Sequence, residues 1–81
     1  MLYAKVTRPN SGYSIDKEKI KVLSRETYYP VSISMGGSNT SVFVRGYPNS
    51  FNSVNFDFFK VVGNVFVEHD IFSDPYYNPY L

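Results

Sequence analysis

The stretch VSISMGGSNTSVFV, residues 31–44, decides the fold class of this chain. Every second residue is apolar through VSISM (31–35) and again in TSVFV (40–44), which is the pattern of strands that bury one face. Between them, GGSN (36–39) is a turn sequence, because its glycines accept the positive φ angles that tight turns demand. The stretch therefore predicts a β-hairpin.

The same alternation recurs on both sides of this hairpin. It predicts strands over LYAKVTR (2–8) and VNFDFFKVV (54–62), and a return strand over VFVEHDIF (65–72). The dipeptide GN at 63–64 is a two-residue turn signal that joins the last two strands. The positions expected to face inward are Leu2, Ala4, Val6, Val54, Phe56 and Phe58.

The segment DKEKIKVLSRETYY (16–29) is ambiguous. We expect a strand from about Lys19 to Thr27, with the lysines at 17, 19 and 21 on one side; a helix over residues 15–25 is the alternative. Connectors rich in Gly, Pro, Asn and Ser follow residues 8 and 45, and the second, GYPNSFNS (46–53), has room for one 3₁₀ turn.

Five or six short strands at this spacing predict an all-β barrel or sandwich. The layout resembles the SH3-like barrel over residues 2–62: PNSGYSID (9–16) stands at its long first loop, GGSN at its distal hairpin and YPNSFNSVNF (47–56) at its 3₁₀ turn. The chain also resembles small SH3-like proteins of bacteria and phages. The resemblance implies a small SH3-like barrel of five to six strands; because MLYAKV begins the chain and Trp is absent, it does not extend to binding of proline-rich peptides.

The chain divides into a barrel over residues 1–72 and an aromatic tail, SDPYYNPYL (73–81). Eighty-one residues form one domain with a thin core, and without cysteine no disulfide reinforces it. Pro75 and Pro79 exclude a further strand, yet three tyrosines are too many for a disordered tail. The tail is therefore expected to pack on the barrel or on a partner.

Catalytic signals are nearly absent. His69 is the only histidine and there is no cysteine, so no Cys–His pair or histidine metal cluster can be assembled. No nucleophile elbow or phosphate-binding loop is present. We expect a protein that is not an enzyme and has no cofactor or metal.

The abundance of tyrosine favours a protein-binding function, because tyrosine is enriched at binding hot spots. By the phage analogy, the module is expected to bind and occlude a bacterial host or defence enzyme as an inhibitor. The expected contact residues are Tyr13, Tyr28, Tyr29, Tyr47, Tyr76, Tyr77, Tyr80 and Arg45.

Two alternatives remain open. A nucleic-acid interface would use Lys17, Lys19, Lys21 and Arg25 with nearby aromatics, although a net charge of +1 argues against a general electrostatic role. A structural or assembly subunit would self-associate through the tail as a homo-oligomer. No apolar run reaches the length of a membrane span and no signal peptide is evident, so we expect a protein of the bacterial or infected-cell cytoplasm without membrane contact.

Overall fold

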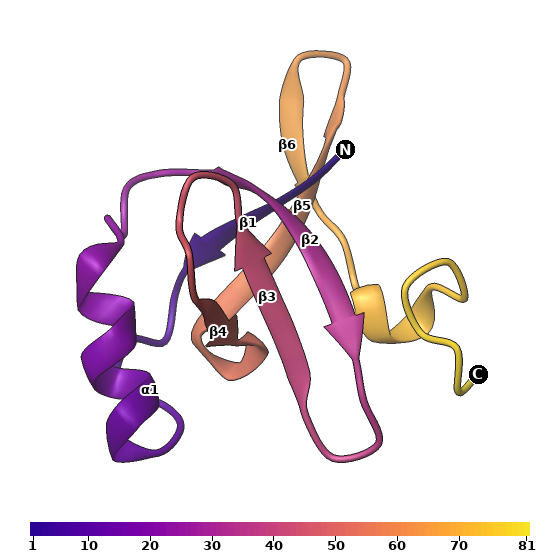
Figure 1. Ribbon diagram of the computed structural model, residues 1–81. Helices are drawn as coiled ribbons and strands as arrows, with labels where there is room; N and C mark the ends of the chain where they lie inside the picture. The colour runs from indigo at the N-terminus through magenta and orange to yellow at the C-terminus, as the bar shows by residue number, and fades with distance from the viewer.

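Six strands pair into one antiparallel sheet in the computed structural model, which describes residues 1–81 (Figure 1). The order across the sheet is β4-β3-β2-β1-β5-β6, and the edge strands β4 and β6 do not pair with each other. The all-β class and the count of strands are confirmed, but the sheet is open and no closed barrel forms. The strands are β1 (Leu2–Val6), β2 (Tyr29–Met35), β3 (Thr40–Val44), β4 (Ser50–Asn52), β5 (Phe56–Val62) and β6 (Val65–Glu68).

Two tight hairpins set the register of the sheet. The expected hairpin of β2 and β3 is confirmed, with Met35 opposite Thr40. The N–H of Gly36 donates to the carbonyl of Asn39 at 2.7 Å, and neither glycine of this turn has a positive φ, so the expected reason for the glycines was wrong. The β5–β6 turn does use positive φ angles, 56° at Gly63 and 66° at Asn64, as a type I′ turn requires.

Strand β1 lies between two strands that are distant in sequence. Ala4 is opposite Tyr29 of β2 on one side and opposite Phe58 of β5 on the other. Its side chains alternate between buried and partly buried, and Leu2, Ala4 and Val6 face the core as expected. The alternation is strict because a shift by one residue would move every apolar side chain to the other face.

The expected strand from Lys19 to Thr27 is wrong. The chain forms α1 (Ser14–Lys19) and a 3₁₀ turn, η1 (Ile20–Val22). The helix begins where the carboxylate of Asp16 accepts the N–H of Tyr13 at 2.8 Å, a capping contact at the first turn. Ile20 and Leu23, three residues apart, are both buried, so the spacing of these core contacts is helical rather than that of a strand.

The connector before β5 places one residue, Val54, differently from the expectation. The expected 3₁₀ turn is present as η2 (Ser53–Asn55), and the side chain of Asn52 accepts the N–H of Val54 at 3.1 Å. Because the turn resets the alternation, Val54 is exposed rather than inward, and Asn55 is fully buried in its place.

The return strand is shorter than expected. It ends at Glu68, and the chain continues into η3 (Ile71–Ser73) instead of extending to residue 72. The carboxylate of Asp70 accepts the N–H of Phe72 at 3.0 Å and the hydroxyl of Ser73 at 2.7 Å. This cap competes with strand pairing and starts the turn.

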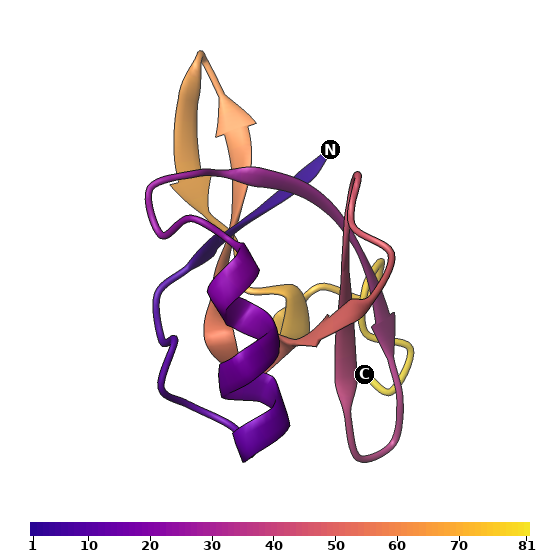
Figure 2. The ribbon, with the colours of Figure 1, turned by 60° about the vertical axis from the view of Figure 1, so that its left-hand side comes forward.

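The core lies on one face of the curved sheet. Helix α1 covers this face on one side and η3 covers it on the other (Figure 2). No helix has both the length and the apolar character needed to cross a membrane. The eleven buried apolar residues are Leu2, Ala4, Val6, Ile20, Leu23, Val42, Val44, Phe51, Phe56, Phe58 and Ile71.

Candidate protein-binding surface

The C-terminal tail is a hydrogen-bonded structure and not a loose end. The Nε2 atom of His69 lies 2.7 Å from a carboxylate oxygen of Asp74, whose other oxygen accepts the N–H of Tyr76 at 2.9 Å. The side chain of Asn78 donates to the carbonyl of Phe72 at 2.8 Å, and its oxygen accepts the N–H of Tyr80 at 3.0 Å. These side-chain hydrogen bonds hold the tail in place of the strand pairing that the two prolines prevent.

The three tail tyrosines have different environments. Tyr77 packs against the core, with the Nζ of Lys60 5.3 Å from its ring centre and the ring of His69 edge-on at 6.0 Å. Tyr76 packs edge-on against Tyr77 at 4.9 Å but remains 84% exposed, and Tyr80 is 65% exposed. The tail therefore packs against the core of the sheet through one ring and presents the other two to solvent.

A groove of about 670 Å³ runs beside the tail. Arg45 and Lys60 are its charged side chains and no carboxylate lines it. The sequence pattern predicted Arg45 but missed Lys60, which follows Phe56 and Phe58 on the inward-facing positions of β5; that register was the available signal. The lining residues are Met1, Leu2, Val31, Ser32, Ile33, Arg45, Lys60, Tyr76 and Tyr77.

Tyr29 and Tyr47 form a second aromatic cluster away from the tail. Their rings meet edge-on at 6.0 Å, and Tyr47 also packs edge-on against buried Phe51 at 6.3 Å. The hydroxyl of Tyr29 accepts the N–H of Ser24 at 2.7 Å and so fixes the segment before β2. Both rings support the fold, although Tyr47 is still 36% exposed.

The remaining predicted tyrosines lie apart from both clusters. Tyr13 is 79% exposed at the start of α1. Tyr28 lies on the outer face of the sheet, stacked on Phe66 at 3.9 Å with the Nζ of Lys5 5.0 Å from its ring centre. The predicted contact residues thus divide among four places, and only Tyr76, Tyr77 and Arg45 line one groove.

The expected lysine stripe does not form. Lys17, Lys19 and Lys21 lie on a helix and a 3₁₀ turn, where alternate residues point in different directions. The Nζ of Lys21 is 3.0 Å from Glu18, and the Nζ of Lys19 lies 5.9 Å from the ring centre of Phe51. Arg25 follows in an exposed turn. The geometry that favoured a phosphate-tracking face is therefore absent.

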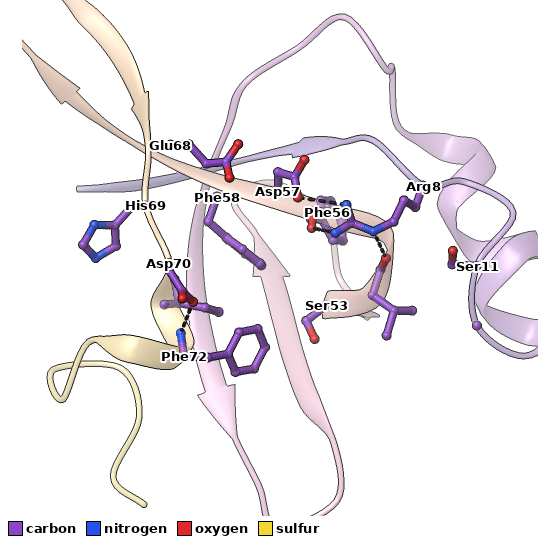
Figure 3. Close-up of a pocket in the computed structure, with 13 residues that line it drawn as sticks. Arg8, Ser11, Ser53, Phe56, Asp57, Phe58, Glu68, His69, Asp70 and Phe72 are labelled. Atoms are coloured by element: carbon purple, nitrogen blue, oxygen red, sulfur yellow. Dashed lines mark hydrogen bonds and ion pairs between the residues drawn. The ribbon is translucent and has the colours of Figure 1, made fainter. Parts of the chain in front are cut away.

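A polar groove of similar size lies between β5 and η3 (Figure 3). Arg8 reaches across it to the carboxylate of Asp57 at 2.9 Å, to the carbonyl of Val54 at 2.9 Å and to the carbonyl of Phe56. These contacts tie the segment after β1 to η2 and β5. No cluster of three or more His, Asp or Glu side chains is placed to hold a metal ion.

Two carboxylates beside this groove have depressed pKa values. The hydroxyl of Ser73, followed by the N–H of Phe72, lowers the pKa of Asp70. The N–H of Tyr76, followed by the side chain of His69, lowers the pKa of Asp74. Each carboxylate is held ionised by hydrogen bonds that also shape the tail.

Comparisons with known proteins place this chain among phage proteins. The family described as "Bacteriophage T4 protein Y07B" matches residues 1–81. A protein of Enterobacteria phage T4, described as "Uncharacterized 11.2 kDa protein in segB-ipI intergenic region", is 35% identical over 80 residues, which cover 93% of this chain and 84% of the relative. No solved structure matches the chain. The expected phage-type origin is confirmed.

Proposed function

The chain belongs to the family of bacteriophage T4 protein Y07B, and from that premise we propose that it is a non-catalytic module with which a phage binds and occludes a protein of its bacterial host. The phage family supports the setting, the infected-cell cytoplasm. The tail supports the mode of action. An inhibitor needs only a complementary surface, and the tail tyrosines with Arg45 supply one.

One observation carries this proposal: the tail presents exposed tyrosines on a fixed backbone. Tyr76 and Tyr80 each donate their N–H to a side chain within the tail, Asp74 and Asn78 respectively, while their rings are exposed. Little backbone entropy is lost when a partner covers these rings, because the tail is already ordered, and each tyrosine side chain has only two χ angles to fix. Exposed tyrosines that are preorganised in this way are typical of binding anchors.

The groove beside the tail defines the chemistry of the partner. Its charged side chains, Arg45 and Lys60, are both cationic, and its floor includes Val31 and Ile33. A partner segment that combines a carboxylate with an apolar side chain would satisfy both features. The guanidinium of Arg45 would form charge-assisted hydrogen bonds at the rim, and the tyrosine rings would cover the apolar contact.

We also infer that the fold is an open relative of the SH3-like barrel. Three features support this reading: the long connection after β1, the tight β2–β3 hairpin and the 3₁₀ turn directly before β5. The central position of β1, between β2 and β5, agrees with a barrel whose edges have not met.

The test is capture of host proteins by the immobilised full chain from a lysate of enterobacterial cells, with the captured proteins quantified by mass spectrometry. The wild type is compared with a Tyr76→Ala/Tyr80→Ala double variant and with Tyr13→Ala, which removes an equally exposed ring elsewhere. A specific partner should remain with Tyr13→Ala and be lost from the double variant. The affinity for the purified partner should fall by about thirtyfold or more, since a hot-spot residue contributes roughly 2 kcal/mol.

Thermal melts of both variants should stay close to the wild type, because the removed rings are mostly exposed and Tyr76 loses only its edge contact with Tyr77. Equal capture of the same proteins by the double variant would refute the proposed surface. Material that nuclease treatment releases, and whose binding falls steeply with salt, would instead support the nucleic-acid alternative.

A further inference from the structure

The β5–β6 hairpin projects beyond the body of the protein in both views (Figures 1 and 2). Five of its apolar side chains are between 38% and 62% exposed, and they lie on both faces of the hairpin because successive residues of a strand alternate. No charged residue interrupts the stretch from residue 61 to residue 67. The five are Val61, Val62, Val65, Phe66 and Val67.

Aromatic packing on one face holds the hairpin in place. Phe66 stacks on Tyr28 at 3.9 Å and meets Tyr3 edge-on at 5.2 Å. The type I′ turn at its tip matches the natural twist of the two strands. The exposed valines are therefore presented in a defined geometry rather than on a loose loop.

The free edge of β6 carries hydrogen-bonding groups in a known order. Val62 and Val65 close the two-residue turn, and the N–H of His69 donates to the carbonyl of Phe58 at 2.8 Å, so the odd-numbered residues of β6 bond to β5. The N–H and C=O groups of Phe66 and Glu68 consequently point away from the sheet. They form a short template for another strand.

The two edges of the sheet differ in their protection. Strand β4 is only three residues long, and the side chain of Asn52 on it donates to Asp16 of α1 at 3.1 Å, so the helix lies beside that edge. Strand β6 has no helix beside it in either view, and it contains no proline or lysine to discourage pairing. The unprotected edge is the apolar one.

From these features we propose that β6 pairs antiparallel with β6 of a second copy of this chain, joining the two sheets into one. The matching register places Phe66 of each copy opposite Glu68 of the other, which uses all the outward N–H and C=O groups. Val67 then meets its own counterpart at the two-fold axis. No like charges are opposed directly, and the net charge of +1 adds little repulsion between copies.

A second copy fits this edge better than an unrelated strand does. Any strand that pairs here meets apolar side chains on both faces, whereas most exposed strands are polar on one face. On the face that carries Val65 and Val67, the same edge of another copy is apolar and complements itself. On the other face, Phe66 of each copy lies opposite Glu68 of its partner, so that face combines an apolar and a charged side chain. The isologous pair also enlarges a core of only eleven buried residues.

Sedimentation velocity of the full chain, from low micromolar to millimolar concentration, tests this proposal. A two-strand contact lies at the low end of specific interfaces, about 1,200 Å² or less, so a reversible dimer in the micromolar range is expected. Val67→Lys sets like charges opposite each other at the axis and should keep the chain monomeric. Val22→Lys adds the same charge at another exposed valine and should dimerise like the wild type.

A backbone variant distinguishes pairing of the β6 edges from nonspecific hydrophobic association. Glu68→Pro removes an outward N–H that β5 does not use, so the monomer should fold and melt like the wild type while dimerisation is lost. Tyr76→Ala/Tyr80→Ala should leave the dimer intact, which distinguishes this edge from the tail surface. A wild-type chain that stays monomeric at every concentration overturns the proposal, whether or not it binds a host protein or phospholipid vesicles. Dimers that persist in both Val67→Lys and Glu68→Pro also overturn it.

Discussion

Truncation of Tyr77 to alanine tests whether the tail is part of the core. The ring packs against the core cluster and contacts Lys60 and His69. Loss of roughly 100–150 Å² of buried surface at about 25 cal/mol per Å² predicts about 2.5–4 kcal/mol. Because an extended reference chain overstates burial by roughly 10–40%, we expect the free energy of unfolding to fall by about 2–3 kcal/mol.

Urea unfolding followed by circular dichroism measures this change, and thermal melts provide a second estimate. For a domain of this size, the melting temperature should fall by about 4–8 °C for each kcal/mol lost. The matched control is Tyr80→Ala, which removes an exposed ring from the same tail and should change stability by less than about 0.5 kcal/mol. If Tyr77→Ala is as stable as Tyr80→Ala, the tail does not contribute to the core and the reasoning is wrong.

Three further perturbations follow from contacts described above. Asp70 and Asp74 have depressed pKa values in the fold, so the stability they contribute is present above the ordinary pKa of 3.8 and is lost as pH falls through the folded values. On acid titration, Asp74→Asn should therefore lose less stability than the wild type. An equal loss would contradict the assignment. Arg8→Lys keeps the charge but loses the forked contacts, so the free energy of unfolding in urea should fall by about 1–2 kcal/mol. The control Lys21→Gln breaks an exposed ion pair and should lower it by less than about 0.5 kcal/mol. Equal losses would remove any special role for the guanidinium. Asn55→Ala removes two part-buried hydrogen bonds, to the carbonyls of Arg8 and Ser11, and should lower the free energy of unfolding by about 2–3 kcal/mol in the same assay. A loss below about 0.5 kcal/mol would show that water replaces the amide.

The strands were predictable wherever local sequence and burial agreed. The β2–β3 hairpin and the β5–β6 turn are encoded by alternation and by turn residues that act over a few positions. The segment before β2 was not predictable, because Lys19 and Lys21 alternate with Ile20 and Val22 as the residues of a strand would. The deciding contacts come from outside that pattern: Asp16 caps α1, and Ile20 with Leu23 enters the core.

The candidate surface was only partly visible in the sequence. The tail was identified from its composition, but composition does not distinguish the ring that packs inward, Tyr77, from the exposed rings of Tyr76 and Tyr80. The approach of Arg45 and Lys60 to the tail depends on pairing between distant strands. The open edge at β6 depends on which strand lies last in the sheet, a property of topology that no local pattern contains.

The central place of β1 has a consequence for the order of folding. The strands β2, β3 and β4 are successive in the chain, as are β5 and β6, so each group can form from short loops. Strand β1 joins the two groups, and its pairing with β5 spans most of the chain, from Tyr3 to Phe59. Closing so long a loop costs entropy before its contacts form, which slows folding. During synthesis β1 can pair with β2 early, but the two groups of strands are joined only after β5 has emerged from the ribosome.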